Sequence, residues 1–127
     1  MSFGDNIAAY AKAKNKTIDT VIKAVSIELF GSVIEDTPRD TGRAQNNWQA
    51  TYNTPAGGEV DSLAATQSVV SGVTSKVNAA PEGAVLFLTN NLPYIAKLET
   101  NNAMVRKNVA RISSAIKSVV RKAEGGL

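Results

Sequence analysis

The sequence contains no cysteine and no histidine. Without cysteine it cannot form disulfides, thiolate metal sites or a cysteine nucleophile, and such a composition is typical of proteins made in a reducing cytoplasm. Without histidine it lacks the commonest general base and the commonest ligand of transition metals. Any catalysis would have to use carboxylates, lysine, tyrosine or serine. We therefore expect a non-enzymatic protein with no catalytic residues, no metal site and no cofactor.

Aromatic residues and long apolar runs are also scarce. Aromatic residues make up 6% of the chain, and Trp48 is the only tryptophan, so a core has to be built mainly from valine, isoleucine, leucine and alanine. No apolar stretch approaches the roughly 20 residues that cross a bilayer. The N-terminus has no basic segment followed by an apolar one. We expect a soluble protein without a targeting segment or a membrane partner.

What the sequence does contain is typical of one globular domain. The 127 residues include 43% hydrophobic and 20% charged residues, with a net charge of +3, values that are ordinary for a folded chain. This mildly basic balance permits acidic partners without requiring them. We expect a single α+β domain over residues 1–127. It should combine a long N-terminal helix, a small antiparallel sheet, a middle helix and an amphipathic C-terminal helix.

The first expected element is one helix over Asp5–Asp36. Apolar residues recur there at spacings of three and four and share one face; they are Ile7, Ala11, Ile18, Val21, Ile22, Val25, Leu29 and Val33. A second apolar flank, formed by Ile27, Phe30 and Ile34, develops only near the C-terminal end. Such a flank must be covered by a second element of the chain or by another subunit. These three residues are candidates for a subunit interface.

Pro38 ends this helix, because proline disfavours helical geometry in the residue before it. The following residues, Arg39–Arg43, are expected to form a turn in which Gly42 takes a positive φ. Polar and apolar residues then alternate over Asn46–Asn53, as in a half-buried strand whose Trp48 and Tyr52 face the core.

The middle of the chain reads as a helix and a second strand. Asp61 or Ser62 can cap a helix, whose apolar residues are Leu63, Val69, Val70, Val73 and Val77. The compact apolar run Ala84–Thr89 has the length of a buried strand. Pro93 is placed to start a helical turn over Tyr94–Glu99, and Thr100–Asn102 forms a polar break.

The last predicted helix is strongly amphipathic. Its apolar residues Val105, Val109, Ile112, Ile116, Val119 and Val120 fall within an arc of roughly 100°, and the helix is expected to stop at Gly125-Gly126. The opposite, basic face holds Arg106, Lys107, Arg111, Lys117, Arg121 and Lys122. This face could be solvated, meet an acidic neighbouring subunit, line a channel for DNA, or bind nucleic acid directly. Aromatic residues for base stacking are absent from it.

One tripeptide, Asp40-Thr41-Gly42, resembles the setting of the catalytic aspartate in aspartic proteases. Those enzymes hold two carboxylates together between apolar strands, whereas Asp40 lies between two arginines just after a helix end. We therefore interpret the tripeptide as a structured turn. In it, Arg43 is expected to meet Asp40 or a carboxylate at the helix end, Glu35 or Asp36.

Two segments together resemble the neck and tail-completion proteins of tailed bacteriophages. In that family a long helix leads into a Thr-Pro-x-Asp-Thr-Gly-Arg turn and a strand with a tryptophan. A later strand ends in Asn-Asn-x-Pro-Tyr-Ile before a short helix. The matching residues here are Thr37, Pro38, Asp40, Thr41, Gly42, Arg43, Trp48, Asn90, Asn91, Pro93, Tyr94 and Ile95. Family members usually have a glycine-rich loop before the last helix, where this chain has only Thr100–Asn102, so loop contacts are not carried over.

The resemblance implies a structural virion protein that forms a ring, expected to be a homohexamer, at the joint between head and tail. Its implied partners are copies of itself and the neighbouring neck, connector and tail proteins, with packaged DNA passing nearby. Its implied locations are the virion and, during assembly, the host cytoplasm. The motif residues would make the fold: Arg43 would bond a carboxylate or helix-end carbonyls, and Asn90 or Asn91 would satisfy the first donors of the following helical turn.

Overall fold

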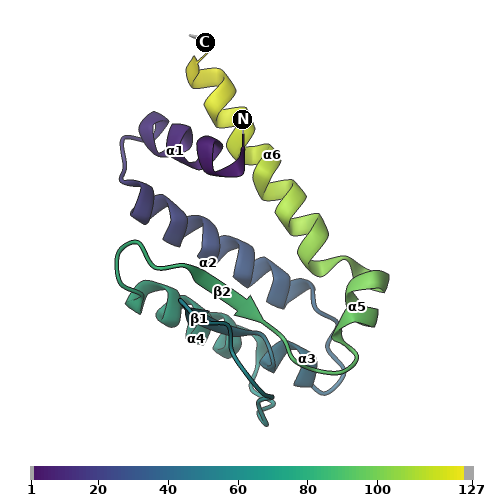
Figure 1. Ribbon diagram of the computed structural model, residues 1–127. Helices are drawn as coiled ribbons and strands as arrows, with labels where there is room; N and C mark the ends of the chain where they lie inside the picture. Colours follow the sequence, from purple (N-terminus) through teal and green to yellow (C-terminus); the bar gives the residue numbers. More distant parts are fainter. Residues whose placement is uncertain (1, 125–127) are drawn as a thin grey trace.

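Six helices and a two-stranded antiparallel sheet make up residues 2–124, the part of the chain that the computed structural model describes (Figure 1). The elements are α1 (Phe3–Ala13), α2 (Ile18–Asp36), α3 (Arg43–Asn46), β1 (Gln49–Tyr52), α4 (Thr66–Ala79), β2 (Leu86–Thr89), α5 (Ile95–Asn102) and α6 (Met104–Glu124). This arrangement confirms the expected α+β class. Within residues 2–124, no helix is both long enough and apolar enough to cross a bilayer.

The expected single N-terminal helix is wrong, because the chain breaks into α1 and α2. Asn15 adopts a left-handed conformation with φ 54°, which a regular helix does not contain. Thr17 then caps α2 by accepting a hydrogen bond from the Thr20 N–H at 3.1 Å. The break lets α1 turn back beside α6 (Figure 1). The predicted end of the long helix at Asp36 is confirmed.

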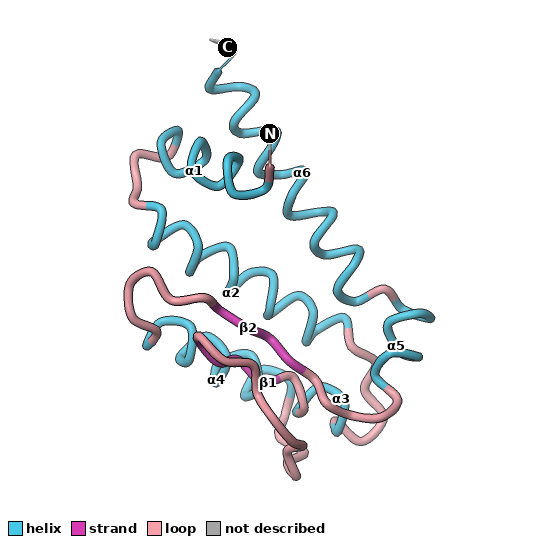
Figure 2. Tube along the Cα trace, viewed as in Figure 1, coloured by secondary structure: helices cyan, strands magenta, loops and turns pink. Residues whose placement is uncertain are grey.

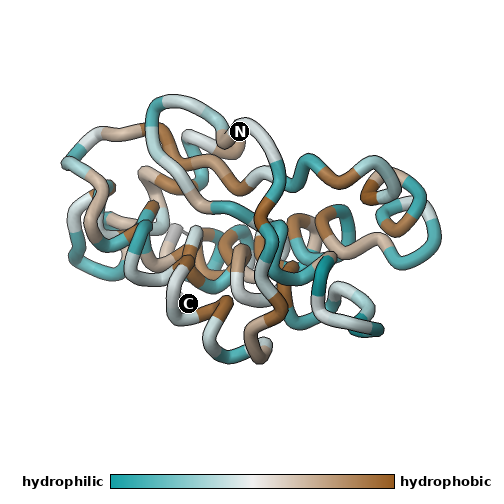
Figure 3. Tube along the Cα trace, turned by 90° about the horizontal axis from the view of Figure 1, so that it is seen from below, coloured by the Kyte–Doolittle hydropathy of each residue, from teal (hydrophilic) through white to brown (hydrophobic). Residues whose placement is uncertain are grey.

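Helix α2 lies in the middle of the molecule and separates two apolar clusters. On one side it packs on α4 and the sheet, and on the other it packs on α1 and α6 (Figure 2). The first cluster contains Phe30, Val33, Ile34, Trp48, Ala50, Val73, Val77 and Met104. The second contains Ile7, Ala11, Val21, Ile112, Ile116 and Val120. Hydrophobic and hydrophilic stretches alternate along the helices in Figure 3, as expected of helices that each bury one face.

Helix α6 buries part of the predicted arc: Ile112, Ile116 and Val120 are buried as expected. Val105 and Val109 are 36% and 41% exposed, whereas Met104 and Asn108 are buried. The buried residues recur at four-residue spacing: Met104, Asn108, Ile112, Ile116 and Val120. Because a four-residue ridge is inclined to the helix axis, it follows α6 as this helix crosses first α2 and then α1. The stop predicted at Gly125-Gly126 lies outside the described residues.

The antiparallel sheet is confirmed, with Gln49 opposite Thr89 and Tyr52 opposite Leu86. The first strand starts later than expected, because residues 43–46 form the short helix α3. Trp48 is buried as predicted, but Tyr52 is 42% exposed because it extends past the end of the core. Strand β2 was expected to be fully buried; instead all four of its residues are half-buried, since it lies at the edge of the sheet.

Two further boundaries differ from expectation. Helix α4 begins at Thr66 rather than near Asp61 or Ser62, and its N-cap Ala65 makes no side-chain cap; Leu63 is consequently 59% exposed. The predicted polar break at residues 100–102 is helical. The chain turns only at Ala103, whose φ is 51°.

A capping box at the start of α1 predicts a response to acid. Ser2 Oγ accepts from the Asp5 N–H at 3.1 Å, and Asp5 Oδ2 accepts from the Ser2 N–H at 3.2 Å. Hydrogen bonds from the side chain and then the backbone of Ser2 hold the pKa of Asp5 below its ordinary value. Because this pKa is lowered on folding, the stabilisation is present above the ordinary pKa and is lost as pH falls through the lowered one.

We expect the amides of α1 to exchange faster, relative to those of α2, as pH falls from about 5 to about 2. Hydrogen-exchange mass spectrometry corrected for intrinsic rates measures this ratio. The Asp5→Asn variant is the control and should show a ratio that changes much less over the same range. A wild-type ratio that does not change with pH would show that the Asp5 carboxylate does not stabilise the start of α1.

Candidate functional site

The two segments that carry the phage-neck resemblance meet in one place, which we call the motif junction and define as residues 37–48, 56–64 and 90–94. The Asn90 side-chain amide donates to the Ala44 carbonyl at 3.0 Å. The Asn91 amide donates to the carbonyls of Ala56 and Gly58, both at 2.9 Å. Residues far apart in the sequence are therefore joined by side-chain amides at the lower end of the molecule in Figure 1, around α3.

At the end of α2 the junction is closed by buried polar groups. Thr37 is 2% exposed; its hydroxyl donates to the Val33 carbonyl at 2.6 Å and accepts from the Trp48 indole N–H at 2.9 Å. Gln45, 3% exposed, donates to the carbonyls of Ile34 and Thr37, both at 3.2 Å. These bonds satisfy carbonyls that the end of a helix leaves free. This role of Gln45 was not predicted, because Gln45 lies between the expected turn, Arg39–Arg43, and the expected strand, Asn46–Asn53.

Two asparagines bind the segment after β1 through both ends of their amides. Asn47 donates to the carbonyls of Arg43 and Val60 at 2.9 and 3.0 Å, and its Oδ1 accepts from the Val60 N–H at 2.7 Å. Asn46 is bonded in the same two-ended way to Ala64. Each side-chain amide thus bonds the backbone N–H and carbonyl of one residue, as the peptide group of a neighbouring strand would. These bonds hold residues 60–64 against α3. Neither role was predicted.

Arg43 bonds a carboxylate, as expected, but the named candidates Asp40, Glu35 and Asp36 are wrong. Arg43 pairs with the Glu59 carboxylate at 2.6 Å on the surface, whereas Asp36 contacts Lys107 and Asn108 of α6. Asp40 and Pro38 are exposed, and Thr41 accepts from the Arg43 N–H at 3.2 Å. The fold brings Glu59, rather than Asp40 or the carboxylates at the end of α2, next to Arg43. Sequence spacing alone could not predict this contact.

Gly42 has the predicted positive φ, 93°. A Cβ at this position would lie 2.9 Å from the guanidinium of Arg39. Arg39 is the arginine that reaches inward: it donates to Gln45 Oε1 at 2.7 Å and to the Ala64 carbonyl at 3.2 Å. The backbone conformation therefore requires glycine at this position, whereas the nearby guanidinium ends a flexible, exposed side chain that is free to shift.

The predicted capping role of the asparagines is also corrected. Asn90 Oδ1 accepts from the Leu92 N–H at 3.2 Å, which lies before α5, and Asn91 faces the 56–58 segment. Tyr94 is the N-cap residue of α5 but makes no side-chain cap, and it is 41% exposed. Pro93 is exposed beside it. Both asparagines fix the junction rather than the helix start.

The candidate subunit interface is corrected by the packing of α2. Phe30 and Ile34 are 8% and 0% exposed within the single chain, and Ile27 packs against the same cluster. Helix α4 and the sheet cover this flank. The sequence allowed two coverings, another element of the same chain or another subunit, and the structure shows the first. These three residues are not a free surface for another subunit.

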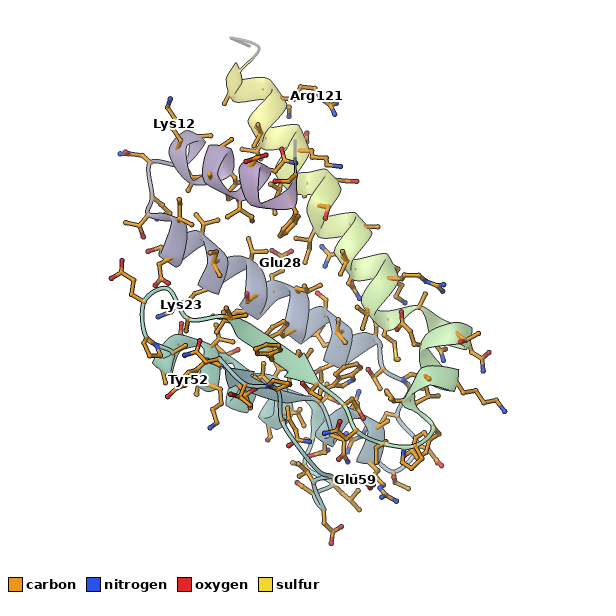
Figure 4. All side chains as sticks on the ribbon, in the orientation of Figure 1. Lys12, Lys23, Glu28, Tyr52, Glu59 and Arg121 are labelled. Carbon is orange, nitrogen blue, oxygen red and sulfur yellow. The ribbon has the colours of Figure 1, made fainter. Side chains whose placement is uncertain are left out.

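The basic face of α6 is partly used inside the chain. Lys107 lies 3.6 Å from the Asp36 carboxylate, and Arg111 contacts Glu28 at 3.3 Å and the Ser32 hydroxyl at 3.0 Å. These contacts fasten α6 to α2. The other four residues, Arg106, Lys117, Arg121 and Lys122, are exposed. Figure 4 shows that Arg121 and Lys12 project at the end of the molecule where α1 and the end of α6 lie.

A groove of about 430 Å³ runs between β1, α4 and the 60–64 segment. Trp48, Ala50, Val69 and Val73 contribute its apolar lining, and Lys76 is the one charged residue among the described residues that line it. The groove borders the motif junction through Asn46 and Ala64. Its lining combines hydrogen-bonding and apolar groups.

Residues 2–124 bring together no group of three or more acidic side chains that could hold a metal ion. Compared with known proteins, the chain matches no family model, no curated protein and no solved structure. The candidate site is therefore defined by its own residues: a hydrogen-bonded junction beside an apolar groove.

Proposed function

We propose that this chain is a structural virion protein of a tailed bacteriophage that forms a homo-oligomeric ring at the head-tail junction and joins or completes the tail. One observation carries the proposal: the two segments that resemble neck and tail-completion proteins lie side by side, joined by the hydrogen bond from Asn90 to the Ala44 carbonyl, and together they line one pocket. The antiparallel pairing of β1 with β2, in which Gln49 lies opposite Thr89, brings the ends of the two segments together. Their meeting supports a shared architecture.

The surface also supports a role in binding other subunits. Several large apolar side chains are more than a third exposed: Phe3, Ile18, Tyr52, Leu63, Val85, Tyr94, Val105 and Val109. Val105 and Val109 lie about one turn apart on α6 and form a small exposed apolar pair. Single exposed apolar residues are common, but contiguous apolar patches and grooves mark contact surfaces. In a ring, modest contacts of this kind are repeated by symmetry and gain avidity.

We place the ring, expected to be a homohexamer, among neighbouring neck, connector and tail proteins of the virion, after assembly in the host cytoplasm. The exposed cations at the ends of α1 and α6 favour proximity to packaged DNA without sequence readout. A duplex-binding accessory protein is the alternative. It would retain DNA in a way that weakens steeply with salt, whereas a ring subunit should show little retention.

A stop codon in the gene tests the proposal directly. Infected cells should then accumulate filled heads and separate tails that fail to join, as counted in electron micrographs of the lysate. Adding the purified wild-type protein should restore complete particles, and adding the Phe30→Asp variant, which cannot fold its core, should not. Normal yields of intact particles from the stop-codon genome would refute the proposed function.

A further inference from the structure

The sheet has two edges without a strand partner among the described residues, since β1 pairs only with β2. The Asn53 N–H donates to the Val85 carbonyl at 2.7 Å. In an antiparallel pair, bonded and non-bonded positions alternate. Gln49 and Thr51 therefore bond β2, and the backbone groups of Ala50 and Tyr52 point away from it. By the same alternation, those of Leu86 and Leu88 point to the other edge.

The edge at Ala50 opens into the groove, where α4 contains a glycine that the chain itself does not need. Glycine inside a helix costs about 1 kcal/mol relative to alanine. A Cβ on Gly72 would meet no atom within 4 Å, and Gly72 lines the groove. Neither its backbone conformation nor its own packing requires a glycine. The open space suits the close approach of a backbone from outside the chain.

Charge and polarity identify what fits this groove. Lys76 lines the groove together with Thr51. It has no ion-pair partner among the described residues, so a carboxylate would suit this position. The loop between α4 and β2 carries the exposed Glu82, and Val85, just before β2, is 60% exposed. This loop leads into the N-terminal end of β2. In an antiparallel pairing that end lies opposite the C-terminal end of a β1 strand, near Lys76.

We propose that copies of this chain associate head to tail, with the outer edge of β2 from one copy paired to the outer edge of β1 in the next. Glu82 of the first copy then faces Lys76 of the second, and the backbone passes over Gly72. When the strands lie along the rotation axis, rotation preserves their direction, so the sheet continues antiparallel through every copy. A contact of this heterologous kind closes into a ring when the rotation between neighbouring copies divides a full turn evenly. The inference rests on the proposed ring and names its interface.

Self-association of five proteins tests the interface by native mass spectrometry and sedimentation over a range of concentrations: wild type, Gly72→Leu, Lys76→Glu, Glu82→Lys and the double charge swap. Gly72→Leu should remove assembly, because the side chain fills the path of the incoming strand, and its melting temperature should not fall because leucine favours helix. Each single charge reversal should weaken association about two- to fivefold per contact. The double swap should restore it.

The absence of native cysteine allows a direct proximity test. A preparation with Lys76→Cys is mixed with a size-tagged preparation with Glu82→Cys and oxidised; a disulfide-linked heterodimer is expected. A mixture of Lys97→Cys with Glu82→Cys is the matched control, because Lys97 is exposed on α5, and it should give only background.

Two results would overturn the inference: assembly of Gly72→Leu at wild-type concentrations, or wild-type protein that stays monomeric throughout. Rings that persist in Gly72→Leu would reject strand pairing and leave the ring itself standing. Failure of the proposed function is seen separately, as intact particles from the stop-codon genome.

Discussion

Phe30→Ala is expected to lower the free energy of unfolding by about 3–5 kcal/mol, the usual cost of emptying a large buried aromatic site. Phe30 is 8% exposed and belongs to the cluster between α2, α4 and the sheet. Removing the ring of Phe30 takes away contacts that α2 makes with both α4 and the sheet. Urea denaturation of the purified protein, followed by the fluorescence of Trp48 in the same cluster, measures the loss.

Phe3→Ala is the matched control for this substitution. The chemical change is the same, but Phe3 is 51% exposed at the start of α1, so a loss of about 1 kcal/mol or less is expected. Equal stabilities of Phe30→Ala and wild type, together with lost self-association, would show that Phe30 serves a subunit interface after all.

Asn47→Asp is expected to destabilise the fold by about 3 kcal/mol or more, because it buries a charge and removes a donor from paired carbonyls. The side chain of Asn47 is fully buried, and its amide nitrogen donates to two carbonyls, those of Arg43 and Val60. In the aspartate variant a carboxylate oxygen would face these two carbonyl oxygens and repel them. The 58–64 segment should detach, which thermal melting and proteolysis near Val60 would report.

Asn53→Asp provides the corresponding control. Asn53 is exposed, and its side chain serves only as an acceptor for the Val85 N–H at 3.0 Å, a bond that a carboxylate keeps. Its left-handed backbone is also one that aspartate tolerates. If Asn47→Asp and Asn53→Asp have the same melting temperature, the buried amide of Asn47 does not stabilise the motif junction.

Much of the fold could be predicted from periodicity and turn chemistry. The end of α2 before Pro38, the presence of two short strands and the inward-facing side of Trp48 followed from residues within a few positions of each feature. The break between α1 and α2 was missed because Lys14–Thr17 contains neither proline nor glycine. Its signals were Asn15, which tolerates a left-handed backbone, and Thr17, a good N-cap.

Features that depend on tertiary placement could not be predicted from the sequence. Periodicity shows that the flank with Ile34 must be covered but not by what, since a helix of the same chain and a neighbouring subunit bury it equally well. The row that α6 buries depends on its crossing angle with α2 and α1, which a helical wheel does not contain.

In the candidate site, too, the location could be predicted from the sequence but the bonding partners could not. The motif residues mark the correct region, because both segments gather at the junction. Their partners depend on the path of residues 56–64, which have no regular secondary structure. For that reason Glu59 was missed as the partner of Arg43, as was the two-ended bonding of Asn46 and Asn47.

Particle imaging offers the most direct test of the proposed function. An antibody fragment against the chain, bound to intact phage particles and averaged by electron microscopy, should appear as a ring of equally spaced labels at the joint between head and tail. Labels located elsewhere on the particle, or purified particles that bind none, would contradict the proposed function.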